Sequence, residues 1–119
     1  LQISRLELIK NDGSYYDWST TTATTNPPLN QTNGEIPSNM LDHSLIKIWL
    51  EYKHALEFYF DVGESNTFSV DDISSWQWWT ANDTASYPGR NPKSFKLQFS
   101  IDGTNYITVD EVTNYSAPA

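Results

Sequence analysis

Three tryptophans stand within four consecutive positions of the stretch SSWQWWTAND, residues 74–83. If this stretch is a β-strand, successive side chains alternate between its two faces. Trp76 and Trp78 then share one face, while Trp79 shares the other with Gln77. We expect residues 73–81 to form a strand, and the two sets of indoles need not have the same role in it.

Other stretches show the same two-residue period, which is typical of half-buried strands. One face of the stretch 55–62 has Leu56, Phe58 and Phe60, and one face of the stretch 94–101 has Phe95, Leu97 and Phe99. The dipeptide Asp102-Gly103 indicates a turn, so residues 105–112 are expected to return as the second strand of a hairpin. Residues 1–9 also alternate, with a change of parity that predicts a bulge or twist near Ser4.

The segment 14–39 is rich in Thr, Asn and Pro and has no sustained period. We interpret it as a long surface loop with one short strand over residues 15–19; a loop of this length is usually functional or held down. Residues 38–52 form the only stretch suited to a helical turn.

Five or more alternating segments separated by turn signals predict an all-β chain, an antiparallel β-sandwich. The 119 residues suit a single domain over 1–119, and there are no cysteines to form disulfides. The first residue is Leu1, so we expect a domain excerpted from a longer or processed protein. The high aromatic fraction of 14% and the many Asn, Thr and Ser residues favour a secreted module.

Charge argues against several partners. Seven Lys and Arg residues face 15 Asp and Glu residues, for a formal charge of −8. Nucleic acids and anionic membrane surfaces call for a basic face, and no apolar run is long enough to span a bilayer. We therefore expect neither a nucleic-acid partner nor membrane insertion.

Catalysis is also not expected. The two histidines are His43 and His54, and no nucleophile, zinc or phosphate-loop motif is present. Pairs of neighbouring acids such as Asp71-Asp72 point to opposite faces of a strand, and nothing selects a carboxylate pair suited to glycoside hydrolysis. The chain is predicted not to be an enzyme and to need no cofactor.

The stretch WWTANDTASYPGRNPKSFKLQFSIDGTNY, residues 78–106, resembles the segment of discoidin-like, galactose-binding-like domains that runs from a TAND motif through an Arg-Asn-Pro loop to a DG turn. The stretch PSNMLDHSLIKIWLE, residues 37–51, looks like an upstream segment of the same family. The resemblance implies a jelly-roll β-sandwich of about eight strands. It also implies that Trp76, Trp78 and Trp49 belong to the core and that the protein is a binding module.

Many members of that family hold a structural calcium ion near the segment that Asp42 matches. Here His43, Ser44 and Lys47 replace the family's usual residues, and an ammonium near the site opposes a cation. We expect no metal site, with calcium at Asp42 as the less favoured alternative.

The candidate binding residues are aromatic or charged side chains expected at loop ends: Trp79, Trp18, Tyr16, Asp83, Arg90 and Tyr87. An exposed indole or phenol could stack on a sugar ring, and a carboxylate or guanidinium could bind hydroxyls. The alternatives are structural. The Thr-rich loop could cover Trp79, Trp18 could fix the loop to the sandwich, and Asp83 and Arg90 could form a salt bridge.

The expected function is therefore that of a noncatalytic, lectin-like carbohydrate-binding module of an extracellular protein, with a glycan or polysaccharide as partner. The alternative is a structural or adhesion domain that contacts neighbouring protein domains in a surface or fibre assembly. If the source is a eukaryote that secretes the protein, Asn30 in the triplet Asn-Gln-Thr is the expected glycosylation site.

Overall fold

A computed structural model of the chain describes residues 1–26, 36–42, 48–49, 56–81 and 84–116. The strands are β1 (Gln2–Ile3), β2 (Arg5–Lys10), β3 (Thr22–Asn26), β4 (Ile48–Trp49), β5 (Glu57–Asp61), β6 (Ile73–Trp79), β7 (Phe95–Phe99) and β8 (Ile107–Val112). Short 3₁₀ helices are η1 (Pro37–Leu41), η2 (Glu64–Asn66), η3 (Val70–Asp72) and η4 (Pro88–Arg90). Within these described ranges there is no α-helix, and the predicted all-β class is confirmed.

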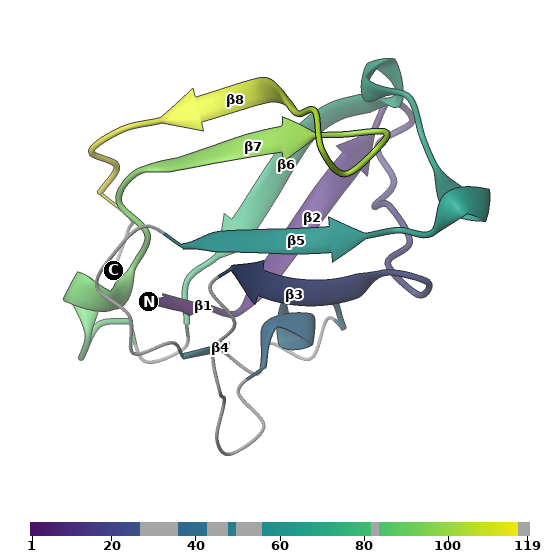
Figure 1. The fold of residues 1–119 in the computed structure, drawn as a ribbon. Coiled ribbons are helices and arrows are strands. Elements are labelled where there is room, and N and C mark those ends of the chain that lie inside the picture. The colour runs from purple at the N-terminus through teal and green to yellow at the C-terminus, as the bar shows by residue number, and fades with distance from the viewer. Residues whose placement is uncertain (27–35, 43–47, 50–55, 82–83, 117–119) are drawn as a thin grey trace.

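The strands pair in antiparallel twos: β1 with β4, β2 with β6, β3 with β5, and β7 with β8. In Figure 1, the β3–β5 pair runs across the β2–β6 pair, and the β7–β8 hairpin lies beside β5. Among the described residues, no further ladder joins these pairs into wider sheets. The arrangement is thus antiparallel and all-β, and the continuous sheets of the expected jelly-roll sandwich are not formed by the described pairings.

The pairing of β2 with β6 places the tryptophans as the alternation predicts. Leu6 lies opposite Trp78 and Leu8 opposite Trp76, while Arg5 lies opposite Trp79 on the other face. Trp76 and Trp78 are partly buried and pack against the core, and both rings meet Phe95 edge to face, with centroids 5.6 and 5.7 Å away. The side chain of Trp49 lies outside the described part of the chain.

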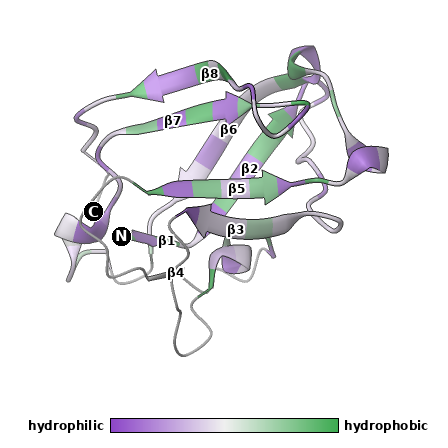
Figure 2. Ribbon diagram, in the orientation of Figure 1, coloured by the Kyte–Doolittle hydropathy of each residue, from purple (hydrophilic) through white to green (hydrophobic). Residues whose placement is uncertain are grey.

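The core lies between the β2–β6 pair and the strands that cross it. Its buried members are Ile3, Leu6, Leu8, Trp18, Met40 and Leu41. Partly buried side chains of β5 and β7 pack against this cluster, including Phe58 and Phe60 from β5 and Leu97 and Phe99 from β7. Figure 2 shows hydrophobic residues on β2 and along the middle of β5, where the two elements cross.

The helical turn expected within residues 38–52 is confirmed. The N-terminal strand is interrupted at Ser4, but the register shift of the β2–β6 ladder lies between Ile9 and Lys10 and not near Ser4. Strand β1 ends at Ile3 and β2 begins at Arg5, so Ser4 separates the two strands. The hydroxyl of Ser4 donates to the carbonyl oxygen of Thr80 over 2.8 Å, which explains why the break is stable there. Helix η1 begins at Pro37 and contributes Met40 and Leu41 to the core.

The interpretation of residues 14–39 as a loop with a short strand over 15–19 is wrong in position. The strand in this segment is β3, which pairs with β5 from Thr22 opposite Asp61 to Asn26 opposite Glu57. Residues near 15 form only an isolated bridge between Tyr15 and Ile9. A run of threonines is a good strand sequence because its branched side chains suit a pleated sheet, and this propensity outweighs the polar composition of the segment.

The β7–β8 hairpin has the predicted alternation and turn. Phe95, Leu97 and Phe99 are partly buried, and the residues between them are exposed. Strand β8, by contrast, is exposed along most of its length. Ile101 in the connecting turn is 97% exposed and Ile107 is 57% exposed.

Candidate functional site

An open hollow of about 620 Å³ lies at the end of the fold where β2 ends and β6 begins. Two segments line it, residues 10–20 and residues 65–73. The aromatic part of the lining is Tyr16 and Phe68; the remainder is mainly hydroxyl, amide and carboxyl side chains. The volume falls within the range of small-molecule sites, and the hollow combines aromatic with polar side chains. Its lining is more polar than that of most such sites, which are predominantly hydrophobic.

Tyr16 is held in the wall of the hollow by two hydrogen bonds and by the rings of Phe68 and Trp18. Its backbone N–H donates to the carbonyl oxygen of Leu8 over 2.8 Å, and its hydroxyl donates to the carbonyl oxygen of Asn66 over 2.8 Å. Its ring lies 4.9 Å from the ring of Phe68, centroid to centroid. Partial burial, and then the nearby carboxylate of Asp17, raise the pKa of Tyr16. The hydroxyl therefore stays protonated and its ring is fixed in orientation.

The two lining segments are tied together by Asn11. Its backbone N–H donates to the carbonyl oxygen of Asp72 over 3.0 Å, and its side-chain amide donates to that of Asp71 over 2.7 Å. Helix η3 begins with a capping box, in which Ser69 accepts from the backbone of Asp71 and Asp72 accepts from the backbone of Ser69. The hollow is thus a preformed feature of the fold.

Two carboxylates of the lining fold back onto their own turns. Asp12 Oδ1 accepts from the hydroxyl of Ser14 over 2.5 Å and from its backbone N–H over 2.9 Å. The Ser14 hydroxyl, and then its N–H, hold the pKa of Asp12 below its ordinary value. Asp17 Oδ1 accepts from the backbone N–H of Ser19 over 2.9 Å. Asp12 is therefore ionised at neutral pH and acts as a hydrogen-bond acceptor.

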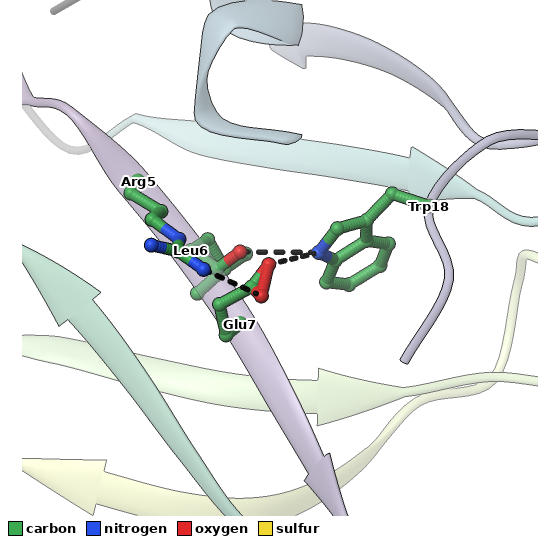
Figure 3. A network of polar contacts seen from close by, with 4 residues as sticks. All are labelled: Arg5, Leu6, Glu7 and Trp18. Atoms are coloured by element: carbon green, nitrogen blue, oxygen red, sulfur yellow. Dashed lines mark hydrogen bonds and ion pairs between the residues drawn. The ribbon is translucent and has the colours of Figure 1, made fainter. Parts of the chain in front are cut away.

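Trp18 is not an exposed platform, and its expected role in stacking a sugar is wrong. Only 6% of the residue is exposed. Its Nε1 donates to the carbonyl oxygen of Leu6 and to Oε1 of Glu7, each over 3.1 Å (Figure 3). Trp18 therefore anchors the segment that includes Tyr16 onto the edge of β2.

Trp79 lies away from the hollow, on the other face of the β2–β6 pair from the core tryptophans. The guanidinium carbon of Arg5 lies 4.5 Å from the Trp79 ring centroid and 5.2 Å from that of Tyr15. Ile73, at the start of β6, lines the hollow, and six residue steps to Trp79 correspond to about 20 Å of strand. Trp79 and Tyr16 therefore do not form one site.

Arg90 and Tyr87 also fall outside the hollow. The Arg90 guanidinium carbon lies 3.9 Å from the ring centroid of Tyr87, and Tyr87 is 43% exposed. Asp83 lies outside the described residues, so its expected salt bridge with Arg90 stays a prediction. Asn30 lies outside them as well. Of the six candidate residues, the structure places Tyr16 in the hollow.

Apart from Tyr16, the residues that line the hollow were not predicted from the sequence, among them Phe68, Asn66 and Asn11. The pattern Ser69-x-x-Asp72 is a capping-box signal and could have located helix η3 beside Phe68. No local pattern indicates that Asn11 bridges to Asp71, because that contact spans 60 positions.

Within the described ranges, no group of three His, Cys, Asp or Glu side chains is placed to hold a metal ion. Asp42 follows η1 and is exposed, whereas residues 43–47 lie outside the described ranges. The alternative of calcium at Asp42 thus stays a prediction. The described residues also include no helix of the length and apolarity that crossing a bilayer requires.

No protein-family model, curated protein or solved structure matches this chain.

Proposed function

We propose that this chain is a noncatalytic carbohydrate-binding module of an extracellular protein, built as a jelly-roll β-sandwich of the discoidin-like kind. The observation on which the function rests is the hollow lined by Tyr16 and Phe68 and by polar side chains. Sugar rings have an apolar C–H face and a rim of hydroxyls. A wall of two aromatic rings next to amides and carboxylates offers a partner to both parts.

The fixed orientation of the wall supports recognition of a ligand. Tyr16 is hydrogen-bonded to Asn66 and packed on Phe68, so little side-chain freedom is lost when a sugar binds. The hollow is open, however, and buries little of any ligand. We therefore expect weak binding per module, with a dissociation constant of about 1 mM, corresponding to about −4 kcal/mol. Useful binding would come from several modules on one polymer.

The carboxylates of the hollow favour binding over hydrolysis. A glycosidase needs a carboxylic acid with a raised pKa to protonate the leaving group. The hydrogen bonds of Ser14 lower the pKa of Asp12 instead. Asp72 is engaged as the cap of helix η3. Asp12 is thus suited to accept hydrogen bonds from hydroxyls and unsuited to donate a proton.

A glycan array followed by calorimetric titration tests the proposal. Tyr16→Ala should abolish saturable binding because it removes the aromatic wall. Tyr87→Ala is the matched control, since Tyr87 is an exposed tyrosine outside the hollow and stacks on Arg90. Silence of the unmodified protein on all glycans would refute the proposal. Loss of binding in Tyr87→Ala but not in Tyr16→Ala would move the site to the other candidate residues.

A second function, adhesion to other protein domains, is favoured by a different observation. The β7–β8 hairpin exposes several large apolar side chains: Ile101, Tyr106, Ile107 and Val109. Exposed apolar groups that lie together mark contact surfaces in many proteins. Analytical ultracentrifugation tests this function: Ile107→Lys should reduce self-association if the hairpin mediates it, and a monomer at high concentration would argue against a contact between copies.

A further inference from the structure

Charge and hydrogen-bonding capacity in the hollow indicate which sugars it selects. We infer that the hollow prefers glycans with free amino groups, such as glucosamine oligomers, over N-acetylated and acidic ones; this rests on the proposed function. The chemical class follows from three features: the balance of charges, the direction of the wall's hydrogen bonds, and the position of Asp17 beside Tyr16.

The balance of charges in the lining is negative. Asp12, Asp17 and Asp72 contribute three carboxylates, and Lys10 contributes one ammonium group. Lys10 lies near enough to Asp12 to help lower its pKa. The formal charge of the lining is therefore −2, in a chain whose charge is −8. A carboxylated or sulfated sugar would be repelled, and an ammonium group attracted.

The hydrogen bonds of the wall leave it richer in acceptors than in donors. The hydroxyl of Tyr16 donates to the carbonyl oxygen of Asn66, and that of Thr20 donates to the carbonyl oxygen of Val62 over 3.0 Å. The Asn11 amide donates to the carbonyl oxygen of Asp71. These donors are committed to the protein's own backbone. The carboxylates of Asp12, Asp17 and Asp72 also accept bonds within the protein, but each ionised carboxylate has further lone pairs and can only accept. A ligand with many N–H donors is the complementary partner, and an ammonium group offers three.

Asp17 and Tyr16 provide a place for the ammonium group. They are neighbours in the chain and both line the hollow. The Asp17 carboxylate is close enough to contribute to the raised pKa of the Tyr16 phenol, after burial. A cation beside the Tyr16 ring would gain from the ring's negative face and from the carboxylate together. Acetylation of the sugar's nitrogen removes that charge while leaving the ring and its hydroxyls in place.

The experiment is a calorimetric titration at pH 6 with three oligosaccharides of equal length: glucosamine, N-acetylglucosamine and galacturonic acid oligomers. We expect the glucosamine oligomer to bind about five-fold more tightly than the N-acetylated one, because a partly exposed ion pair contributes about this factor. The acidic oligomer should bind most weakly. Salt should reduce the preference, since exposed charges are screened.

Asp17→Asn is the informative variant, because it removes one charge at nearly constant shape. This variant should bind the glucosamine oligomer and the N-acetylglucosamine oligomer with similar affinity. Glu111→Gln is the matched control: it also removes one carboxylate, but Glu111 is on β8, paired with Lys96 over 3.6 Å. It should leave the preference unchanged. Equal loss in both variants would overturn the inference, because it would assign the preference to the net charge of the protein.

Two further outcomes separate this inference from the proposed function. Equal binding of the glucosamine and N-acetylglucosamine oligomers, both lost in Tyr16→Ala, would overturn the inference and leave the carbohydrate site in place. No binding of any of the three, together with silence on the glycan array, would overturn both.

Discussion

The indole nitrogen of Trp18 donates a hydrogen bond to Oε1 of Glu7 over 3.1 Å, at a place where Glu7 is 0% exposed. A carboxylate at this depth is stable only where it has partners. Arg5 is the second, with its guanidinium nitrogen 3.5 Å from Oε2 (Figure 3). Trp18 comes from the segment after β2, so the bond fixes that segment, and Tyr16 two residues before it, to the sheet.

The first prediction concerns this bond. Trp18→Phe keeps an aromatic ring in the core but removes the donor to Glu7, and it should lower the free energy of unfolding by about 1–3 kcal/mol. Urea unfolding followed by circular dichroism measures the change. Trp76→Phe is the control, since Trp76 donates to the Asp110 carboxylate over 2.7 Å in an exposed setting. Equal losses of unfolding free energy in the two variants would mean that the burial of Glu7 adds nothing to the strength of its hydrogen bond with Trp18.

The second prediction separates Trp79 from the hollow. Trp79→Ala removes a half-buried ring that packs under Arg5 and should lower the free energy of unfolding by about 1–3 kcal/mol, less than a fully buried aromatic would. Carbohydrate binding should be unchanged in the folded variant. Calorimetry on the refolded protein is the measurement, and abolished binding with intact stability would place the ligand at Trp79 instead.

The third prediction concerns the turn of the β7–β8 hairpin. Gly103 has a φ of +75°, a backbone conformation that residues other than glycine adopt only at a cost in free energy. There is no steric obstacle to a larger residue, since an added Cβ would meet nothing within 4 Å. Gly103→Ala should therefore destabilise the protein by about 1 kcal/mol for conformational reasons alone. Gly89→Ala is the matched control, with similar open space and no positive φ, and it should be neutral or mildly stabilising. Thermal unfolding measures both, and a neutral Gly103→Ala would contradict the assigned turn.

The fourth prediction is a pH dependence from Asp102 in the same turn. Hydrogen bonds from the backbone N–H of Asn105 and then of Thr104 hold the pKa of Asp102 far below its ordinary value of 3.8. The pKa of Asp102 is lower in the folded protein than in the unfolded chain. Its contribution to stability is therefore fully present above the unfolded pKa, and it is lost as the pH falls from the unfolded pKa toward the folded pKa.

Asp102→Asn does not titrate at this position, so it isolates the effect. The difference in unfolding free energy between the unmodified protein and the variant should be constant above about pH 5 and should shrink at lower pH. Chemical denaturation from pH 7 to pH 2.5 measures it. A difference that stays the same over this range would show that the turn does not depend on the ionised carboxylate.

Much of the fold follows from periodicity in the sequence. Strand β7 alternates Phe95, Leu97 and Phe99 inward with Lys96 and Gln98 outward, as its pattern predicts. The shared face of Trp76 and Trp78, which packs against the core, also follows from parity, whereas the pairing of their strand with β2 does not. Strand β3 was missed because its threonines are neither clearly apolar nor clearly polar, so their pattern contains no two-residue signal.

The candidate site was less predictable. Trp18 stands in a polar segment that resembles an exposed loop, and its burial depends on Glu7, whose carboxylate lies on a strand eleven positions away. The hollow joins residues near position 11 to residues near position 71, and such long-range contacts leave no mark in local composition. Tyr16 could be identified from its residue type, whereas its partners Asn66 and Phe68 are brought to it only by the tertiary structure.

Chemical-shift mapping is the most direct test of the proposal that the hollow beside Tyr16 binds sugars. The protein, labelled with ¹⁵N, would be titrated with a glucosamine oligomer, and backbone amide shifts would be assigned along the chain. We predict that the saturating shifts lie in residues 10–20 and 65–73. Shifts confined to residues 84–91 or to β8, or no saturating shift, would contradict it.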